Sequence, residues 1–402
     1  MTSASLKSKQ IIVICPACGL LCDDVQLENN HAINLNCSKG IAFFEQRSAE
    51  NIPQIAGKPA SLQAAILKTA QLLKNSKQPI FTGLSTDVQG FRAVYNLAQK
   101  TNAIHQSNMQ HMNATSMGRN LKVLQSSGWQ TTTLTEVKNR ADVIVCVGSD
   151  IVSHNPRFFE RFIQQDGMFI GAKQREIIFI GENISLKKVE NDALEGAWIL
   201  PCRAVDLAEI TLVLRALVAG KKLKATKVAG IKVSDLQNVA DKLKAAKYAV
   251  LTWVAKDFDF PHAELTIQNI TETVVILNQN TRAAGLPLGG SDGDTAANNV
   301  NTWLSGLTFS DIEIEHDCVV WVNSFSAKKL APKTNKPLIV LGNSNLTFEK
   351  VPDVFIPIAT PGLDCGGTLF RVDSSVALPL KKVRESNLPT LSEIASQIEK
   401  LL

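Results

Sequence analysis

Short apolar runs rich in β-branched residues recur along the chain, separated by longer stretches in which apolar residues return every three or four positions. The short runs have the length and composition of buried strands, and the longer stretches have the period of helices that bury one face. We expect strands at Pro79–Thr82, Asp142–Val147, Glu176–Ile180, Tyr248–Val254, Val319–Val322, Pro337–Leu341 and Val354–Ile358. Strands that alternate with helices predict an α/β fold with mostly parallel sheets.

The clearest helical periods predict helices at Ala60–Lys74, Val88–Lys100, Leu207–Ala219 and Ser234–Lys244. In the first of them Leu62, Ile66, Ala70 and Leu73 fall on one stripe, and Ser61 stands where an N-cap is needed. We expect these helices to cover the faces of the sheets.

Three segments interrupt this alternation. The run Asp142–Val147 is typical of a central strand and ends at Gly148, so the loop Ser149–Arg157 is expected at the carboxyl edge of a sheet, where such folds bind ligands. Gly285–Asp294 is rich in small and turn-forming residues and predicts an irregular loop. The basic stretch Gly220–Val233 predicts an exposed connector, with a surface for an anionic partner as the alternative.

Four of the eight cysteines fall within the first 37 residues, in the spacing C-x2-C-x3-C-x14-C. Cys15, Cys18 and Cys22 are expected on one tight loop that follows a strand at Lys9–Ile14. A hairpin with arms Val25–Glu28 and Ala32–Leu35 then returns the chain to Cys37. Four thiolates that meet in this way predict a metal centre.

Three interpretations of this centre stay open. A structural zinc site usually shows two paired C-x2-C hooks, whereas here three cysteines share one loop, which favours a [4Fe–4S] cluster. A zinc ion is the first alternative, and an empty remnant of a metal site is the second. Cys146 lies inside an apolar run and is expected to be a buried packing thiol.

Composition limits the class of protein. With 402 residues, 45% hydrophobic and 20% charged, the chain is typical of a multi-domain globular protein. No apolar run approaches the roughly 18 residues needed to cross a bilayer and no apolar segment follows Met1, so we expect a cytoplasmic protein without membrane contact. The net charge is +5 and the basic residues are scattered, which argues against a nucleic-acid partner. A GxxxxGK[ST] motif is absent, which argues against an independent NTPase.

The segment Cys15-Pro-Ala-Cys-Gly-Leu-Leu-Cys-Asp-Asp24, followed by Cys37-Ser-Lys-Gly40, resembles the amino-terminal cluster segment of the molybdopterin and tungstopterin oxidoreductases. Within that superfamily it is most similar to the B subunit of formylmethanofuran dehydrogenase. Later segments resemble the same protein in the same order, namely Thr133–Val145 with Ser153–Arg157, then Asn301–Gly306, then Thr360–Arg371. The resemblance covers nearly the whole chain.

The resemblance implies a small amino-terminal four-cysteine domain and two Rossmann-like α/β domains, with the chain passing through one domain, into the other and back. We expect the four-cysteine domain at residues 1–57. The discontinuous α/β domain is expected at 58–110 with 290–402, and the second α/β domain at 111–289.

The same resemblance implies a pterin-bound molybdenum or tungsten ligated by a cysteine or selenocysteine that a histidine follows, with an arginine from a later loop. In this chain the Cys-His pair falls on Ser116 and Met117, and the arginine falls near Gly289. Serine can still ligate through oxygen, but methionine cannot transfer a proton. Arg282, seven residues from Gly289, is the remaining candidate for the arginine. We therefore expect no catalytic residue of this kind and no molybdenum- or tungsten-pterin.

Lys39 comes two residues after Cys37. In the enzymes that the chain resembles, this lysine lies between cluster and pterin, which implies a cofactor-binding role in which the cation stabilises reduced cofactors. A solvated lysine at the start of a helix is the alternative.

A chain with these changes resembles the B subunit of the formyltransferase/hydrolase complex of methylotrophic bacteria. In that complex a formyl group carried on tetrahydromethanopterin is passed to a methanofuran-type carrier and hydrolysed to formate. The resemblance implies that other subunits perform this chemistry and that this chain is their partner, without redox catalysis of its own. An active molybdenum or tungsten formylmethanofuran dehydrogenase with Ser116 as metal ligand is one alternative, and a zinc-bearing interaction protein is another.

Overall fold

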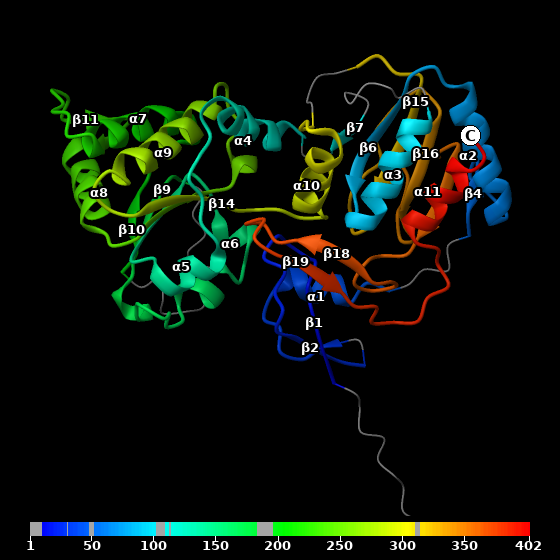
Figure 1. Ribbon diagram of the computed structural model, residues 1–402, viewed down its shortest axis with the longest axis horizontal. Coiled ribbons are helices and arrows are strands. Elements are labelled where there is room, and N and C mark those ends of the chain that lie inside the picture. Colours follow the sequence, from blue (N-terminus) through cyan, green and yellow to red (C-terminus); the bar gives the residue numbers. More distant parts are fainter. Residues whose placement is uncertain are drawn as a thin grey trace, which may run out of the picture. The chain divides into compact units, whose positions relative to one another are not determined.

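A computed structural model describes residues 10–29, 31–47, 52–101, 109–111, 114–182, 196–309 and 314–402. The chain divides into two compact units, Met1–Ala114 with Gly290–Leu402 and Thr115–Gly289. The second unit is thus a continuous segment inserted between the two parts of the first (Figure 1). The four-cysteine head groups with the first unit, and a separate domain at residues 1–57 stays a prediction.

The first unit is built on a seven-stranded sheet with the order β5-β4-β17-β16-β15-β6-β7. The five strands from β17 to β7 run parallel, while β4 and β5 are antiparallel at one edge. The strands are β4 (Gln54–Ile55), β5 (Lys58–Pro59), β6 (Pro79–Ser85), β7 (Met109–His111), β15 (Cys318–Asn323), β16 (Leu338–Asn343) and β17 (Val354–Ile358). All residues of β15, β16 and β17 are buried, as in parallel sheets that are covered on both faces.

The longer helices of the first unit are α2 (Leu62–Asn75), α3 (Val88–Lys100), α10 (Asp294–Ser305) and α11 (Leu391–Glu399). Helix α11 packs against α3 and α2, and α10 packs against α3 (Figure 1). The predicted cap of α2 is confirmed, because Ser61 Oγ accepts a hydrogen bond from the backbone N–H of Ala64 at 3.2 Å. Ile66, Ala70 and Leu73 of the predicted stripe are buried.

The head of the first unit is an antiparallel sheet of β1 (Ile11–Val13), β2 (Val25–Glu28) and β3 (His31–Ala32), followed by α1 (Ser38–Phe44). The predicted hairpin arm Ala32–Leu35 is wrong beyond Ala32. Asn34 there accepts from the N–H of Gln26 at 2.8 Å and donates to the carbonyl of Asp24 at 2.7 Å. One backbone bond continues beyond Ala32, from the N–H of Ile33 to the carbonyl of Gln26 at 3.0 Å, and the side chain of Asn34 makes the contacts that follow. A second hairpin, β18 (Gly367–Phe370) and β19 (Ala377–Leu380), also belongs to this unit.

The second unit contains a five-stranded, fully parallel sheet with the order β10-β9-β8-β13-β14. Its strands are β8 (Val143–Val147), β9 (Glu176–Ile180), β10 (Trp198–Leu200), β13 (Ala249–Trp253) and β14 (Ala283–Pro287). Its helices are α4 (Ala114–Ser127), α5 (Leu134–Arg140), α6 (Ile151–His154), α7 (Leu207–Val218), α8 (Val233–Ala245) and α9 (Glu264–Leu277). Alternating strands and helices with parallel sheets confirm the α/β fold class in both units.

Two of the expected irregular segments are more ordered than the sequence indicated. Gly220–Val233 contains the two-stranded hairpin of β11 (Lys227–Val228) and β12 (Ile231–Lys232), and Val228 and Ile231 are buried. The expected exposure holds for most of residues 220–227, and the expectation was wrong for the hairpin, because Val228 and Ile231 are buried. In Gly285–Asp294, the first three residues form the end of β14, Asp294 begins α10, and only residues 288–293 are a loop.

No helix in the described part of the chain combines the length and the hydrophobicity that a membrane span requires.

Candidate functional site

Cys15, Cys18 and Cys22 lie on the loop between β1 and β2. The loop is closed by a hydrogen bond from the N–H of Cys15 to the carbonyl of Cys22 at 2.8 Å. Its tip is fixed to the rest of the unit at Gly19, which donates to the carbonyl of Gly290 and accepts from the N–H of Val372, both at 2.8 Å. Residues from three distant parts of the sequence therefore determine the shape of this cysteine loop.

Cys37 is the N-cap residue of α1, and its carbonyl accepts the N–H of Ile41 at 2.9 Å. Gly40 lies one turn into this helix. A Cβ at Gly40 would overlap Cδ2 of Leu35 and would lie 3.2 Å from Sγ of Cys15. The absence of a side chain at residue 40 thus lets α1, which begins at Cys37, approach the sulfur of Cys15.

The four cysteines are buried, with 6 to 7% of each residue exposed. Burial raises the pKa of the Cys15 thiol well above its ordinary value, a hydrogen bond from Ala17 lowers it, and negative charge on Cys18, Cys22 and Cys37 raises it further. Each of the other three sulfurs is therefore close enough to Cys15 for its charge to be felt there. The Cys15 sulfur therefore stays a protonated thiol at neutral pH unless a positive centre binds it.

The four cysteine thiols are donors that either a single metal ion or a four-iron cluster could use. Among residues 10–29, 31–47 and the other described segments, no three or more His, Cys, Asp or Glu side chains form an arrangement that could hold a metal ion. A four-iron cluster makes a different demand, because each cysteine binds its own iron and the sulfurs stay further apart than around one ion. Four buried thiols on one loop and one helix start fit that group in donor type and number.

The other cysteines are not part of this group. Cys146 is 1% exposed inside β8, and burial raises the pKa of its thiol well above the ordinary value, so it is the packing residue that we expected. No disulfide joins any of the eight cysteines. Lys39 lies in the first turn of α1 and is half-buried.

Ser116 and Met117 lie in the first turn of α4 in the second unit, and both are half-buried. Gly289 belongs to the same unit and ends the segment after β14. Its φ of +103° is a backbone conformation that side-chain-bearing residues rarely adopt, and a Cβ there would lie 3.0 Å from Cγ1 of Val254. An arginine at residue 289 would therefore require a different loop.

Arg282, the other candidate for the arginine, lies apart from Gly289. It precedes β14 and is exposed, whereas Gly289 follows the other end of the same strand. The two residues thus lie beyond opposite ends of β14.

Sequence reasoning missed the contact that holds Gly289. Asn155, which is fully buried, accepts the N–H of Gly289 at 2.7 Å and donates to its carbonyl at 2.9 Å. In the same loop His154 Nε2 lies 2.6 Å from Oδ1 of Asp257. The predicted position of Ser149–Arg157 after β8 is confirmed, and the loop contains the short helix α6. The only signal in the sequence was the family-like segment Ser153–Arg157, and the partner of Asn155 is 134 residues away.

No protein-family profile matches the chain. It is 26% identical to the B subunit of the tungsten-containing formylmethanofuran dehydrogenase 2 of Methanococcus maripaludis, and the match covers 97% of each chain. It is 24% identical to the B subunit of the formyltransferase/hydrolase complex Fhc of Methylorubrum extorquens, over 86% of this chain and 95% of that one.

Solved structures share the fold. The formyltransferase/hydrolase complex FhcABCD of Methylorubrum extorquens, solved with methylofuran, matches with a TM-score of 0.70 and 22% identity, over 87% of this chain and 98% of that chain. Acetylene hydratase from Pelobacter acetylenicus matches with a TM-score of 0.62 and 10% identity, over 97% of this chain and 69% of that one. From the sequence relatives, the chain is homologous to the B subunits of formylmethanofuran dehydrogenase and of the formyltransferase/hydrolase complex.

Proposed function

We propose that this chain is a subunit of a formyltransferase/hydrolase-type complex of one-carbon metabolism and has no redox catalysis of its own. The proposal rests on the resemblance, in which the metal-ligating Cys and the following His of the redox enzymes fall on Ser116 and Met117. The left-handed φ of Gly289 is a further obstacle to the arginine of those enzymes. Hydrolysis of a formamide needs no electrons, so such a complex can lose these groups.

In this proposal the transfer of a formyl group from tetrahydromethanopterin to a methanofuran-type carrier, and its hydrolysis to formate, take place on partner subunits. The partners are the other subunits of the complex, since the homologous Fhc protein is part of an assembly of that kind. The cytoplasmic location expected from the sequence stays a prediction.

The test is to purify the tagged chain from its own cells and to measure formate release, dye-linked formate oxidation, and Fe, Zn, Mo and W per chain. We expect co-purifying subunits, formate release, and neither molybdenum nor tungsten in stoichiometric amount. The double variant Ser116→Ala with Met117→Leu should leave formate release unchanged. Stoichiometric tungsten or molybdenum together with formate oxidation would contradict the proposal.

A second candidate is an active tungsten enzyme in which Ser116 ligates the metal. The observation in its favour is that the relatives with 26% identity, from Methanococcus maripaludis and Methanocaldococcus jannaschii, are tungsten-containing dehydrogenase subunits. The same metal analysis separates the two candidates, because Ser116→Ala would remove tungsten from this enzyme and would change nothing in the complex proposed above.

We also propose that Cys15, Cys18, Cys22 and Cys37 hold one [4Fe–4S] cluster. The proposal is supported by four buried thiols, by their mutual electrostatic effect on Cys15, and by the close approach that Gly40 permits. When bound, such a cluster supplies a cross-link between the cysteine loop and α1 and can exchange single electrons.

Iron and acid-labile sulfide in anaerobically purified protein test this site. About four irons per chain are expected, and Cys37→Ser should lose most of them. Cys202→Ser is the matched control, because Cys202 is buried to a similar degree in the second unit. One zinc per chain would support the zinc alternative, and no metal at all would support the empty remnant.

Formate release by the assembled Lys39→Ala complex distinguishes a cofactor-binding role of Lys39 from the alternative that Lys39 is only a solvated side chain. We expect formate release to stay unchanged, because hydrolysis does not draw on the redox state of a cluster. A large loss of turnover in a complex that still assembles would show that electron transfer through this site matters.

A further inference from the structure

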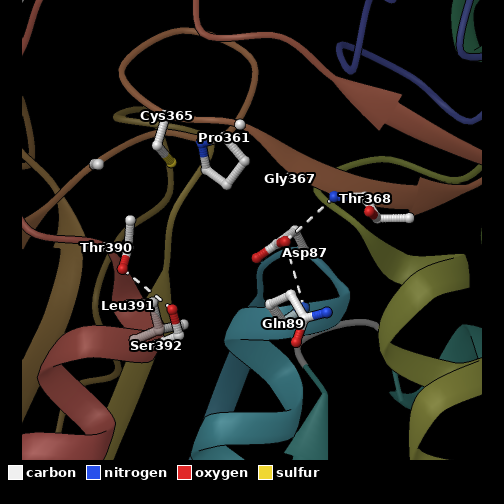
Figure 2. A pocket seen from close by; sticks show the side chains of 11 residues that line it. Asp87, Gln89, Pro361, Cys365, Gly367, Thr368, Thr390, Leu391 and Ser392 are labelled. Atoms are coloured by element: carbon white, nitrogen blue, oxygen red, sulfur yellow. Dashed lines mark hydrogen bonds between the residues drawn. The ribbon is translucent and has the colours of Figure 1, made fainter.

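A pocket of about 330 Å³ lies at the carboxyl edge of the sheet in the first unit, within the size range of small-molecule sites. Asp87 and Gln89 line it from the start of α3, and Thr390, Leu391 and Ser392 from the start of α11. Ala359, Pro361 and the segment 365–368, which follow β17, form the remaining wall. Figure 2 shows the carboxylate of Asp87 and the sulfur of Cys365 facing the space between the two helix starts.

Asp87 is the charged group of this pocket and is 7% exposed. Its carboxylate accepts backbone N–H groups from Gly90 at 3.0 Å and from Gln89 and Thr368 at 3.3 Å. It forms no ion pair with any residue in the described segments. Burial raises the pKa of this carboxyl in spite of the three donors, so the charged form lacks a cation that would stabilise it.

The carboxylates around Cys365 make the electrostatic potential in the pocket negative. Burial first, and then the charges of Asp87, Asp364 and Glu393, raise the pKa of this thiol to about 12, with Lys382 acting in the opposite direction. The thiol is therefore protonated at neutral pH and is not a nucleophile. The field around it is negative.

The nearby cations are engaged elsewhere. Lys382 forms an ion pair with Glu385 at 2.9 Å. Arg384 forms an ion pair with Asp364 at 2.7 Å. Neither of them neutralises Asp87.

Two helix starts at one pocket would ordinarily attract an anion. The N-terminus of each of these two helices already interacts with a carboxylate of the chain. Asp87 caps α3, and Glu393 accepts the N–H of Thr390 at 2.8 Å in the capping box of α11. A further anion would be repelled by both carboxylates, whereas a cation would be attracted.

We propose that this pocket binds the ammonium group of a small primary amine. The carboxylate of Asp87 accepts one N–H of the ammonium and supplies the opposite charge. The hydroxyl of Ser392, 3.1 Å from that of Thr390, offers a further acceptor, whereas the Thr390 hydroxyl is engaged by Glu393 in the capping box. Ala359, Pro361 and Leu391 give an apolar wall for the alkyl part. The volume corresponds to roughly ten water molecules, which suits an alkylammonium of several non-hydrogen atoms.

Calorimetric titration of the purified chain, with any subunits that accompany it, tests this proposal at constant ionic strength. The probes are butylammonium chloride, sodium butyrate and tetramethylammonium chloride. We expect saturable 1:1 binding of butylammonium alone, because butyrate carries the wrong charge and tetramethylammonium has no N–H group. Asp87→Asn should weaken that binding by about tenfold or more, since a charge-assisted hydrogen bond is lost.

Asn is as good an N-cap as Asp, so Asp87→Asn should keep α3 intact, which circular dichroism can verify. Asp317→Asn is the matched control, because Asp317 also accepts two backbone N–H groups in this unit, those of Lys77 and Gln78. It should bind butylammonium as the wild type does. Ser392→Leu fills the pocket without altering Asp87 and should abolish binding. Wild-type protein that does not bind butylammonium, that binds butyrate instead, or that is matched by Asp87→Asn overturns the proposal.

Discussion

Gly40 shows how a single residue controls the approach of two segments in this protein. Its place in α1 is helical, where alanine is ordinarily the better residue. The reason for glycine is contact, because an added methyl group would meet Leu35 and the sulfur of Cys15.

We predict that Gly40→Ala lowers the free energy of unfolding by about 1–3 kcal/mol, the usual cost of overpacking. It should also lower the iron content, since Cys37 at the start of α1 would be displaced from Cys15. Urea denaturation and iron analysis measure the two effects. Gly171→Ala is the control, because its added Cβ would make only ordinary contacts from 3.4 Å outward. Wild-type stability in Gly40→Ala would contradict this account of the helix packing.

His111 is a buried histidine that should destabilise the folded protein in acid. Burial, and then the charge of Lys329, lower the pKa of this histidine to about 3, so the ring is neutral at physiological pH. Its 3.4 Å approach to Asp294 is accordingly a polar contact and not an ion pair at that pH.

Below the ordinary histidine pKa of about 6.5, the unfolded chain binds a proton at His111 that the folded chain does not. His111 should therefore contribute a stability loss of up to about 1.4 kcal/mol per pH unit as the pH falls from 6.5 toward 3. His111→Gln should remove that part of the slope, as measured by urea denaturation at several pH values. Gln110→Ala changes a neighbouring residue that does not titrate, so this variant should retain the pH dependence of stability. An unchanged slope in His111→Gln would show that the ring is protonated in the folded state.

At the scale of elements, Asn155 joins the loop after β8 to the loop after β14. Both of its hydrogen bonds go to the backbone of Gly289, and the side chain is fully buried. The loops of two strands that are separated by β13 in the sheet are thereby held together.

We predict that Asn155→Ala lowers the free energy of unfolding by about 2–3 kcal/mol, because two buried hydrogen bonds are lost and the groups of Gly289 are left without partners. Asn155→Asp should not restore stability, since a carboxylate cannot donate to the carbonyl of Gly289. Asn299→Ala removes a single hydrogen bond to Ser374 on a half-buried side chain and should cost less. An equal loss of stability in Asn155→Ala and Asn299→Ala would argue against a special role of the two hydrogen bonds between Asn155 and Gly289.

At the scale of the whole molecule, the second unit is one uninterrupted segment with its own core. The five strands of its parallel sheet all come from Thr115–Gly289. The main hydrophobic cluster of this unit extends from Val123 to Ala283. The first unit is different, because β6 needs β15 from the second part of the chain as its neighbour.

We predict that a fragment of residues 114–289, which keeps α4 whole, folds alone. Circular dichroism should show an α/β spectrum, and urea should unfold the fragment cooperatively. The fragment of residues 1–114 is the control and should stay unfolded, because β15, β16 and β17 are missing. A fragment 114–289 without cooperative unfolding would show that this unit depends on the other.

Local patterns in the sequence were sufficient for several of the regular elements. Glu176–Ile180, Val354–Ile358 and Val88–Lys100 were predicted with the bounds that the structure has. Burial of every residue in a strand, or of one face of a helix, imposes a period that neighbouring residues reveal by themselves. The four-cysteine spacing and the Ser116-Met117 replacement are likewise properties of the sequence alone.

Tertiary structure decided the features whose cause lies far away in the chain. Gly285 suggested a loop, yet it belongs to β14, where a Cβ would lie 3.1 Å from the ring of Trp253. The contact of Asn155 with Gly289 and that of Asp87 with Thr368 join residues 134 and 281 positions apart. Such contacts form only when strands and helices assemble, since no local period records which distant groups will share a buried space.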